Sequence, residues 1–386
     1  MNNVKLVALG CALLFCSAAS AQLPRNASFT TQATTPLAIE GLTADAHGNL
    51  YTTGRATSPA LCPVWRITGA TLTVVGFLPN PAACNPSGIA FDAFGNLYVA
   101  DAASGGRVWR LTPDAATPPT ATAFATGVPG TNGLAFDRDG NLWTGDGTTG
   151  QGRVWRIHPN GGVCEPDPTG CVEAFRIQPM RNGAGVGRQN GTLQPGVAEP
   201  NAQNLVANGL AFTPEGDLYV ADTARGAIWK VELDRHGDVQ SRMNCDTTFT
   251  PNTLCLDAVF AAHPYLEGTD GIALDQAGNI WNSANERNAI VAVTRQGGVR
   301  EIFRNPVNAA GLRNAADTAE GNRRILELPT SPVLAGKRFC TANSDGNRRD
   351  NSPNAAGEIM PAGPARGKIS CMDQPLTVPG MPLPLR

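Results

Sequence analysis

The chain of 386 residues is poor in charge, and the charge it carries is balanced. Charged residues make up 16% of the sequence, and 30 Lys and Arg stand against 32 Asp and Glu. A nucleic-acid surface needs a basic excess, and a solvating acidic tail needs the opposite excess. The composition excludes both classes, so we expect no nucleic-acid partner.

Several common catalytic and metal-binding signatures are also missing. The four histidines include no H-E-x-x-H motif, and no G-x-S-x-G elbow is present. These absences argue against a histidine-held zinc site and against a serine hydrolase. No C-x-x-C spacing occurs, which disfavours a metal site built from cysteines.

Long apolar runs are absent apart from one short run at the start of the chain. It extends from Leu6 to Phe15, follows Lys5, and precedes the small residues that end at Ala21. Ten residues are too few to cross a bilayer as a helix, but they suit a signal peptide. We therefore predict a cleavable signal peptide over residues 1–21, no transmembrane segment, and a periplasmic or secreted protein.

The eight cysteines beyond that segment fall into four close pairs along the chain. An even number of cysteines in an exported protein favours disulfides. We predict four bridges between sequence neighbours, which are Cys62–Cys84, Cys164–Cys171, Cys245–Cys255 and Cys340–Cys371.

Glycine and proline, in contrast, are abundant, with 43 and 30 residues, and many of the glycines belong to one phrase that is written five times. One copy reads Asn132-Gly-Leu-Ala-Phe-Asp-Arg-Asp-Gly-Asn-Leu-Trp. Each copy predicts two short strands joined by a turn whose glycine takes a positive φ. Two further apolar segments follow most copies. The first glycines of the five phrases are Gly41, Gly88, Gly133, Gly209 and Gly271.

Four short antiparallel strands per unit, repeated at this period, are typical of a β-propeller blade. A degenerate sixth unit at residues 325–343 completes the ring, and Ser28–Thr35 supplies a strand that clasps it. We therefore predict an all-β protein, a six-bladed β-propeller of four-stranded antiparallel blades. It would occupy residues 22–344, and a Pro/Gly-rich tail, residues 345–386, would pack on the propeller or extend from it.

The residue before the first glycine of each phrase varies, whereas the rest of the phrase does not. In a propeller these residues converge at one end of the central channel. Oxygen ligands of this kind suit Ca²⁺ first, and Mg²⁺, Zn²⁺ or Mn²⁺ as well. The alternative is ordinary turn chemistry, because Asn and Asp are common before glycine. The five residues are Glu40, Ser87, Asn132, Asn208 and Asp270.

The phrases that begin at Glu40, Asn208 and Asp270, together with Thr330 to Gly336, resemble the SMP-30/gluconolactonase/LRE-like family of six-bladed, metal-dependent propellers. The resemblance implies one divalent ion held by Glu40, Asn208 and Asp270. It also implies that Asp270 is the general base. Asn132 and Ser87 are candidates for contact with the substrate or the metal. Family members that hydrolyse sugar lactones often carry an arginine just before the third-blade phrase, and this chain has none there.

The first hypothesis is therefore an exported metal-dependent hydrolase of lactones or related esters, with a small-molecule substrate. In such an enzyme a carboxylate takes a proton from the attacking water. The alternative is a non-catalytic propeller that binds a protein, peptide or glycan, with or without structural calcium. A third hypothesis is a lyase that uses the same ion. A propeller hosts many activities, so the fold alone does not choose between them.

Overall fold

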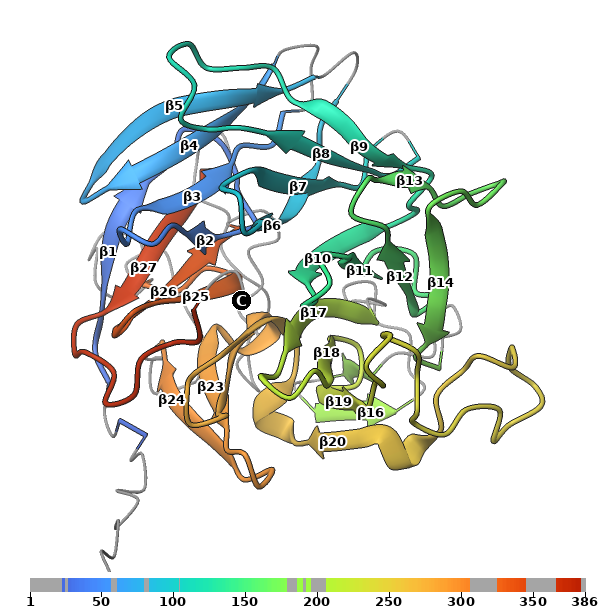
Figure 1. Cartoon of the computed structure of the whole chain (residues 1–386). Helices are drawn as coiled ribbons and strands as arrows, with labels where there is room; N and C mark the ends of the chain where they lie inside the picture. Colours follow the sequence, from blue (N-terminus) through green and yellow to red (C-terminus); the bar gives the residue numbers. More distant parts are fainter. Residues whose placement is uncertain are drawn as a thin grey trace, which may run out of the picture.

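The computed structural model describes residues 23–24, 27–56, 61–79, 83–103, 105–178, 186–189, 192–195, 206–305, 325–344 and 366–382. Six antiparallel sheets stand around a central channel like the blades of a propeller (Figure 1). The predicted fold class is confirmed. The signal-peptide prediction falls on residues outside the described part of the chain.

Each blade runs from an innermost strand at the channel to an outermost strand at the rim. Blade 1 contains β2 (Thr43–Ala44), β3 (Leu50–Thr53), β4 (Cys62–Thr68) and β5 (Thr71–Leu78). Blade 2 contains β6 (Pro86–Phe91), β7 (Leu97–Asp101), β8 (Arg107–Leu111) and β9 (Thr122–Thr126). Blade 3 contains β10 (Thr131–Phe136), β11 (Leu142–Asp146), β12 (Arg153–Ile157) and β14 (Cys171–Arg176).

The other three blades follow the same order. Blade 4 contains β17 (Ala207–Phe212), β18 (Leu218–Asp222), β19 (Ala227–Val231) and β20 (Val259–Ala262). Blade 5 contains β21 (Thr269–Leu274), β22 (Ile280–Ala284), β23 (Ala289–Val293) and β24 (Val299–Arg304). Blade 6 contains β25 (Pro329–Ala335), β26 (Arg338–Asn343), β27 (Lys368–Met372) and β1 (Phe29–Thr34).

A few short elements decorate this frame. They are β13 (Gly162–Val163), which joins β9 in parallel, the hairpin of β15 (Val186–Gln189) and β16 (Thr192–Pro195), and the 3₁₀ turns η1 (Leu256–Ala258), η2 (Pro264–Leu266) and η3 (Asn285–Arg287). The β13 strand belongs to the loop between the third and fourth strands of blade 3, and it ties that blade to blade 2.

The ring is closed by its two chain ends. Strand β1 pairs with β27 at the rim of blade 6, so the predicted N-terminal clasp is confirmed. Strand β27 itself lies within the segment that the sequence assigned to the tail. Its pairing with β26 includes the Cys340–Cys371 disulfide. Pairing both ends into one sheet removes the open edges that an unclosed ring would expose.

The turns between the two inner strands share one cap, which explains the constant part of the phrase. In blade 3, Asp137 Oδ1 accepts the backbone N–H groups of Asp139 and Asn141 at 3.0 and 2.8 Å. Its Oδ2 accepts Asn141 Nδ2 and Trp143 Nε1, both at 2.9 Å. Gly140 makes the turn with a φ of +82°. Equivalent aspartates, which are Asp45, Asp92 and Asp275, cap blades 1, 2 and 5 in the same way.

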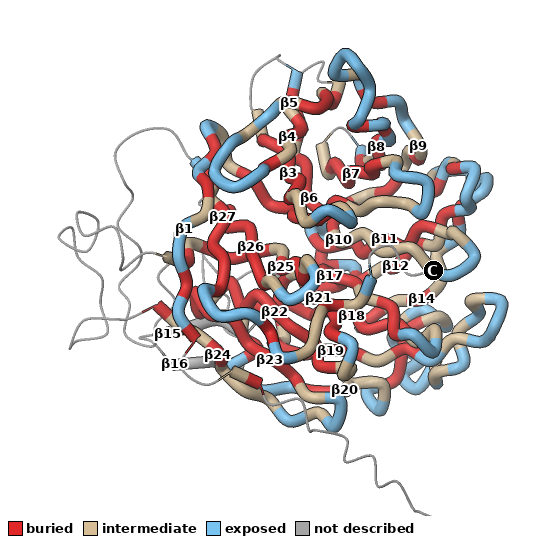
Figure 2. Tube along the Cα trace, turned by 60° about the vertical axis from the view of Figure 1, so that its left-hand side comes forward, coloured by how far each residue is buried: buried red, intermediate tan, exposed pale blue. Residues whose placement is uncertain are grey.

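Apolar side chains fill the spaces between neighbouring blades. Most strand residues are accordingly buried, whereas exposed residues gather in the turns (Figure 2). The recurring tryptophans are part of this packing. Trp109 and Trp229 also donate their indole N–H groups to Asp101 and Asp222, which end the second strands, at 3.0 Å each. The tryptophans therefore stabilise the blades by packing and by these hydrogen bonds.

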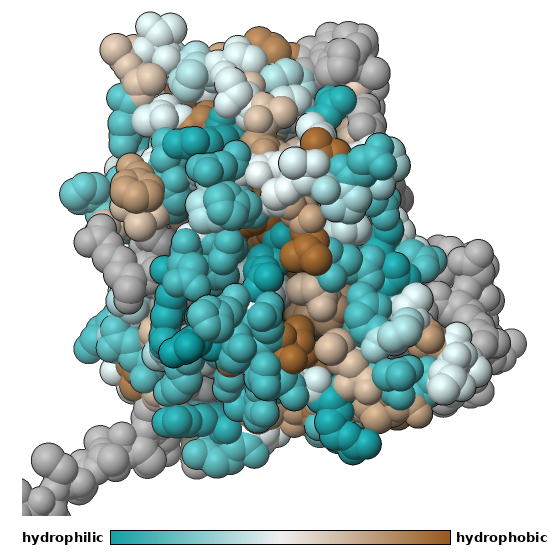
Figure 3. Space-filling model, turned by 45° about the vertical axis from the view of Figure 1, so that its right-hand side comes forward, coloured by the Kyte–Doolittle hydropathy of each residue, from teal (hydrophilic) through white to brown (hydrophobic). Residues whose placement is uncertain are grey.

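The structure contains the four predicted disulfides, which are Cys62–Cys84, Cys164–Cys171, Cys245–Cys255 and Cys340–Cys371. On the face seen in Figure 3, apolar side chains are scattered among hydrophilic ones. The large exposed apolar residues come from separate blades, for example Phe94 and Leu256. In the part of the chain that the structure describes, no helix is long and apolar enough to span a bilayer.

The turn cap generates a stability prediction. Asp137→Ala removes a half-buried carboxylate that accepts four hydrogen bonds, and it leaves the indole N–H of Trp143 without its partner. We expect a loss of about 2 kcal/mol in the free energy of unfolding, measured by urea denaturation. The matched control is Asp139→Ala in the same exposed turn, where a change within about 0.5 kcal/mol is expected. Equal effects of the two substitutions would refute the role of the cap.

Candidate metal and substrate site

Six polar residues form a ring around one end of the channel. Each blade contributes one of them, at or just before the start of its innermost strand. We call them the polar ring, and they are Glu40, Ser87, Asn132, Asn208, Asp270 and Thr330. All six are buried, with exposed fractions between 1 and 9%. The ring closes where Thr330 Oγ1 donates to the backbone oxygen of Glu40 at 2.7 Å. The five sequence-predicted positions are therefore brought together, and blade 6 adds Thr330 as a sixth.

The glycine after each ring residue sets how closely the blades approach. A Cβ atom on Gly88 would lie 2.1 Å from the backbone oxygen of Asn132 in the next blade. A Cβ atom on Gly209 would lie 2.5 Å from the backbone oxygen of Asp270. No side chain fits at either point, so glycine is required for close approach rather than for an unusual φ. This close packing holds neighbouring ring residues side by side.

A second residue from the same blade supports several ring residues. It follows the end of the second strand, 15 positions after the ring residue. Asn208 Nδ2 donates to Thr223 Oγ1 at 3.0 Å, and Asn285 Nδ2 donates to Asp270 Oδ2 at 2.8 Å. In blade 3 the position is Gly147, where a Cβ atom would lie 2.6 Å from Asn132 Cβ. These contacts orient the Asn208 and Asp270 side chains toward each other at the channel.

Blade 1 places an arginine at this supporting position. Arg55 follows β3 and forms an ion pair with Glu40. Its Nε donates to the backbone oxygen of Pro86 at 3.4 Å, and it also interacts electrostatically with Asp270. Burial lowers the pKa of Arg55 to about 10, and the charge of Asp270 opposes that shift. The guanidinium therefore remains charged at neutral pH.

Asp270 is the most perturbed carboxyl group of the ring. Burial raises its pKa to about 7, because a desolvated carboxylate is costly. Hydrogen bonds from Asn285 and Asn208 and the positive charge of Arg55 oppose this shift without cancelling it. Asp270 is thus a carboxyl group that exchanges its proton near neutral pH, which is the property that a general acid or base needs.

Ser87 and Asn132 are less well directed toward the acids. Ser87 Oγ donates to the backbone oxygen of Thr131 in the next blade at 3.0 Å, so its hydroxyl helps to join blades 2 and 3. Asn132 is buried against Gly147. Neither residue has a contact that assigns it to the substrate or the metal, and those two roles stay predictions.

The donor set fits a hard divalent cation. Glu40 and Asp270 offer carboxylate oxygens, and Asn208 uses its amide NH₂ for Thr223 and Asp270, which leaves the amide oxygen for a cation. Two carboxylates and an amide oxygen are ligands that Ca²⁺ and Mg²⁺ accept. Among the described residues, no three His, Cys, Asp or Glu side chains cluster, so such a site depends on Asn208.

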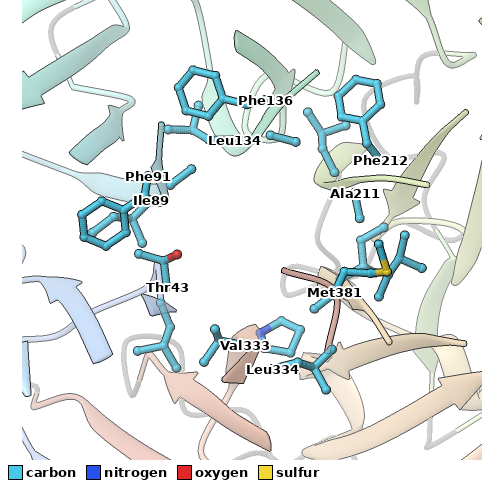
Figure 4. Close-up of a pocket in the computed structure, with 18 residues that line it drawn as sticks. Thr43, Ile89, Phe91, Leu134, Phe136, Ala211, Phe212, Val333, Leu334 and Met381 are labelled. Carbon is cyan, nitrogen blue, oxygen red and sulfur yellow. The ribbon is translucent and has the colours of Figure 1, made fainter. Parts of the chain in front are cut away.

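The channel beyond the ring has a different character. Two to four residues further along the inner strands, apolar side chains from the blades enclose a cavity of about 140 Å³ (Figure 4). Phe91, Phe136 and Phe212 lie at separate points around its wall, and Met381 of the C-terminal segment lies on the same side as Phe212. Met381 is held there by its backbone N–H, which donates to Leu274 O at 2.9 Å. The polar chemistry is therefore confined to the ring end.

Reasoning from the sequence missed Arg55, Asn285 and Thr330. The signal for the first two was present, because Arg55 and Asn285 each lie 15 residues after a ring residue, Glu40 and Asp270 respectively. Thr330 carried a weaker signal, because blade 6 has Ser331 where the other blades have glycine.

Comparison with known proteins places the chain among propellers. Residues 169–311 match the model of the SMP-30/Gluconolactonase/LRE-like region. No curated protein matches the sequence. Among solved structures, regucalcin from Agrobacterium tumefaciens, described as a calcium-binding protein, has a TM-score of 0.56 at 16% identity. The match covers 94% of this chain and 99% of that one.

Two other structures show how widely the fold is used. A gluconolactonase from Xanthomonas campestris has a TM-score of 0.53 at 17% identity, over 94% of this chain and 93% of its own. The PQQ-bound aldose sugar dehydrogenase from Streptomyces coelicolor has a TM-score of 0.55 at 16% identity, over 91% of this chain and 100% of its own. At such identities the likeness shows the fold alone.

The match of residues 169–311 to the SMP-30/Gluconolactonase/LRE-like region agrees with the sequence-based resemblance for that part of the chain, and the chain has a six-bladed β-propeller fold like those of the solved regucalcin and gluconolactonase structures.

Proposed function

We propose that the protein is a metal-dependent hydrolase of lactones or related esters that acts outside the cytoplasm. The observation that carries the proposal is the polar ring, where Glu40, Asn208 and Asp270 converge at one end of the channel although they lie on three different blades. Burying two carboxylates costs desolvation free energy, so their presence in the ring argues for a function.

Glu40, Asn208 and Asp270 would hold the ion, and Ca²⁺ suits this oxygen set best. A bound divalent ion polarises the carbonyl group of an ester or lactone and stabilises negative charge on its oxygen. The residues 15 positions after the ligands hold them in place by hydrogen bonds, Thr223 with Asn208 and Asn285 with Asp270. Such supporting hydrogen bonds set the orientation of metal ligands.

Asp270 would act as the general base. In the metal-free protein, burial raises the pKa of Asp270 to about 7. A bound divalent ion would lower this pKa and also that of a water molecule beside it, so the carboxylate would receive its proton from an activated water. Asn285 donates to one carboxylate oxygen of Asp270, and Asn208 also donates to this carboxylate. A water molecule held beside Asp270 would lose its proton to the carboxylate as it attacks the ester carbonyl carbon.

Two further observations support the location and the substrate class. Four disulfides fit an oxidising compartment outside the cytoplasm. The match of residues 169–311 to the SMP-30/Gluconolactonase/LRE-like region supports a small lactone or ester as the substrate rather than a macromolecular partner. The non-catalytic binding scaffold remains the alternative, and the experiment below separates the two.

The metal content of the purified mature protein tests the proposal. We expect about one divalent ion per chain, and its loss in Glu40→Gln, Asn208→Ala and Asp270→Asn. The variants should lower the hydrolysis of a lactone and ester panel by about 10²-fold or more, since base and ion are both lost. Asp139→Ala, in the exposed turn of blade 3 and outside the polar ring, is the control and should keep the ion. If the parent takes up neither Ca²⁺, Mg²⁺, Mn²⁺ nor Zn²⁺, the binding scaffold becomes the better account.

The raised pKa of Asp270 predicts a pH dependence of the metal-free protein. An unfolded aspartate ionises near 3.8, and folded Asp270 ionises near 7. Between these values the folded state binds the extra proton, so this group lowers the free energy of unfolding as the pH rises from about 4 to 7. Urea denaturation of the parent and of Asp270→Asn should give curves that diverge in this direction. Parallel curves would show that the carboxyl group is not perturbed.

A further inference from the structure

The guanidinium of Arg55 stands against the acids that would bind the ion. It forms an ion pair with Glu40 of its own blade, and it also interacts electrostatically with Asp270 of blade 5. The side chains of Arg55 and Glu40 are only 26 and 11% exposed, so water screens this pair weakly. A cation that belongs to the protein therefore already neutralises the ring.

This placement is built into blade 1. The backbone N–H of Arg55 donates to Ala38 O at 2.8 Å. Ala38 lies two residues before Glu40, so this bond holds the backbone of Arg55 close to Glu40. Its Nε donates to Pro86 O, at the beginning of the inner strand of blade 2. The equivalent positions of blades 3, 4 and 5 hold the uncharged Gly147, Thr223 and Asn285. In the described ring, Arg55 is thus the one cation at this position.

A divalent ion and the guanidinium of Arg55 compete for the carboxylate oxygens of Glu40. The N–H groups of arginine bind the carboxylate lone pairs that a metal ligand must offer. Two cations a few ångströms apart also repel each other in a poorly screened site. The ion therefore binds fully only when Arg55 leaves Glu40.

We propose that Arg55 is a tethered cation that competes with the divalent ion for Glu40. In the metal-free protein it neutralises the buried acid, and on ion binding it turns away from Glu40 toward the open end of the channel. The inference rests on the proposed metal site. It adds that the affinity of the site is set by an internal competitor, so the site loads only when the free ion is abundant.

Calcium binding to the purified mature protein tests this inference directly. Isothermal titration of the metal-free parent and of Arg55→Gln should give an affinity for Ca²⁺ about tenfold or more higher in the variant, because the competitor is gone. Arg55→Lys keeps the charge and should stay close to the parent. Arg66→Gln removes the same charge from β4 of the same blade, where Arg66 faces Asp114 at 3.7 Å, and should leave the affinity unchanged.

Thermal melting supplies a second readout that a merely structural arginine would not reproduce. Metal-free Arg55→Gln should melt at a lower temperature than the parent, since Glu40 is left buried without its partner. Saturating Ca²⁺ should then raise its melting temperature by more than it raises that of the parent. Competition predicts both changes together, whereas a structural role predicts only the first.

An affinity for Ca²⁺ in Arg55→Gln that equals or falls below that of the parent would overturn the inference, because Arg55 would then be neutral or helpful to the ion. This failure differs from a failure of the proposed function. In that case neither the parent nor Arg55→Gln would bind Ca²⁺, Mg²⁺, Mn²⁺ or Zn²⁺, and both proposals would fall.

Discussion

The close approach of the six inner strands is the constraint on which the rest of the molecule depends. At the level of the first glycines, the backbone of one blade touches the carbonyl oxygen of the next, and a Cβ atom at Gly88 or Gly209 would collide with it. The residue just before each glycine is consequently buried beside its counterparts. Residues separated by hundreds of positions, such as Glu40 and Thr330, are thereby hydrogen-bonded neighbours.

This geometry buries carboxyl groups in the ring, and their charged forms are therefore poorly hydrated. Buried acids such as Glu40 and Asp270 lose hydration, and desolvation is what raises the pKa of Asp270 to about 7. A hydrogen bond from Asn285 to Asp270 and the charge of Arg55 beside Glu40 offset part of this cost. The same features that make the acids costly make them suited to bind a cation or to accept a proton near neutral pH. The cavity beyond the polar ring, in contrast, is lined mainly by apolar side chains, which neither bind a cation nor accept a proton (Figure 4).

Much of the fold could be predicted from the sequence because its determinants are local and repeated. Asp137, Gly140 and Trp143 all belong to one turn, so each copy of the phrase predicts one hairpin. The five copies indicate five blades, and a degenerate unit without the phrase forms the sixth. Strand β27 escaped prediction because its pairing with β26 spans a long segment of chain and follows no repeated motif. The ring positions were predictable from the frame. The position of Arg55 also had a signal, its offset of 15 residues from Glu40, but the ion pair between them forms across a hairpin and does not follow from that offset.

The central claim is that the ring is a cation site in which Arg55 and a divalent ion exclude each other at Glu40. A crystal structure of the mature protein soaked in Mn²⁺, with anomalous diffraction data, tests it most directly. The account predicts one anomalous peak within about 2.5 Å of oxygen atoms of Glu40, Asn208 and Asp270, with the Arg55 side chain turned away from Glu40. Saturating Mn²⁺ that leaves no peak in the ring, with Arg55 still paired to Glu40, would contradict it.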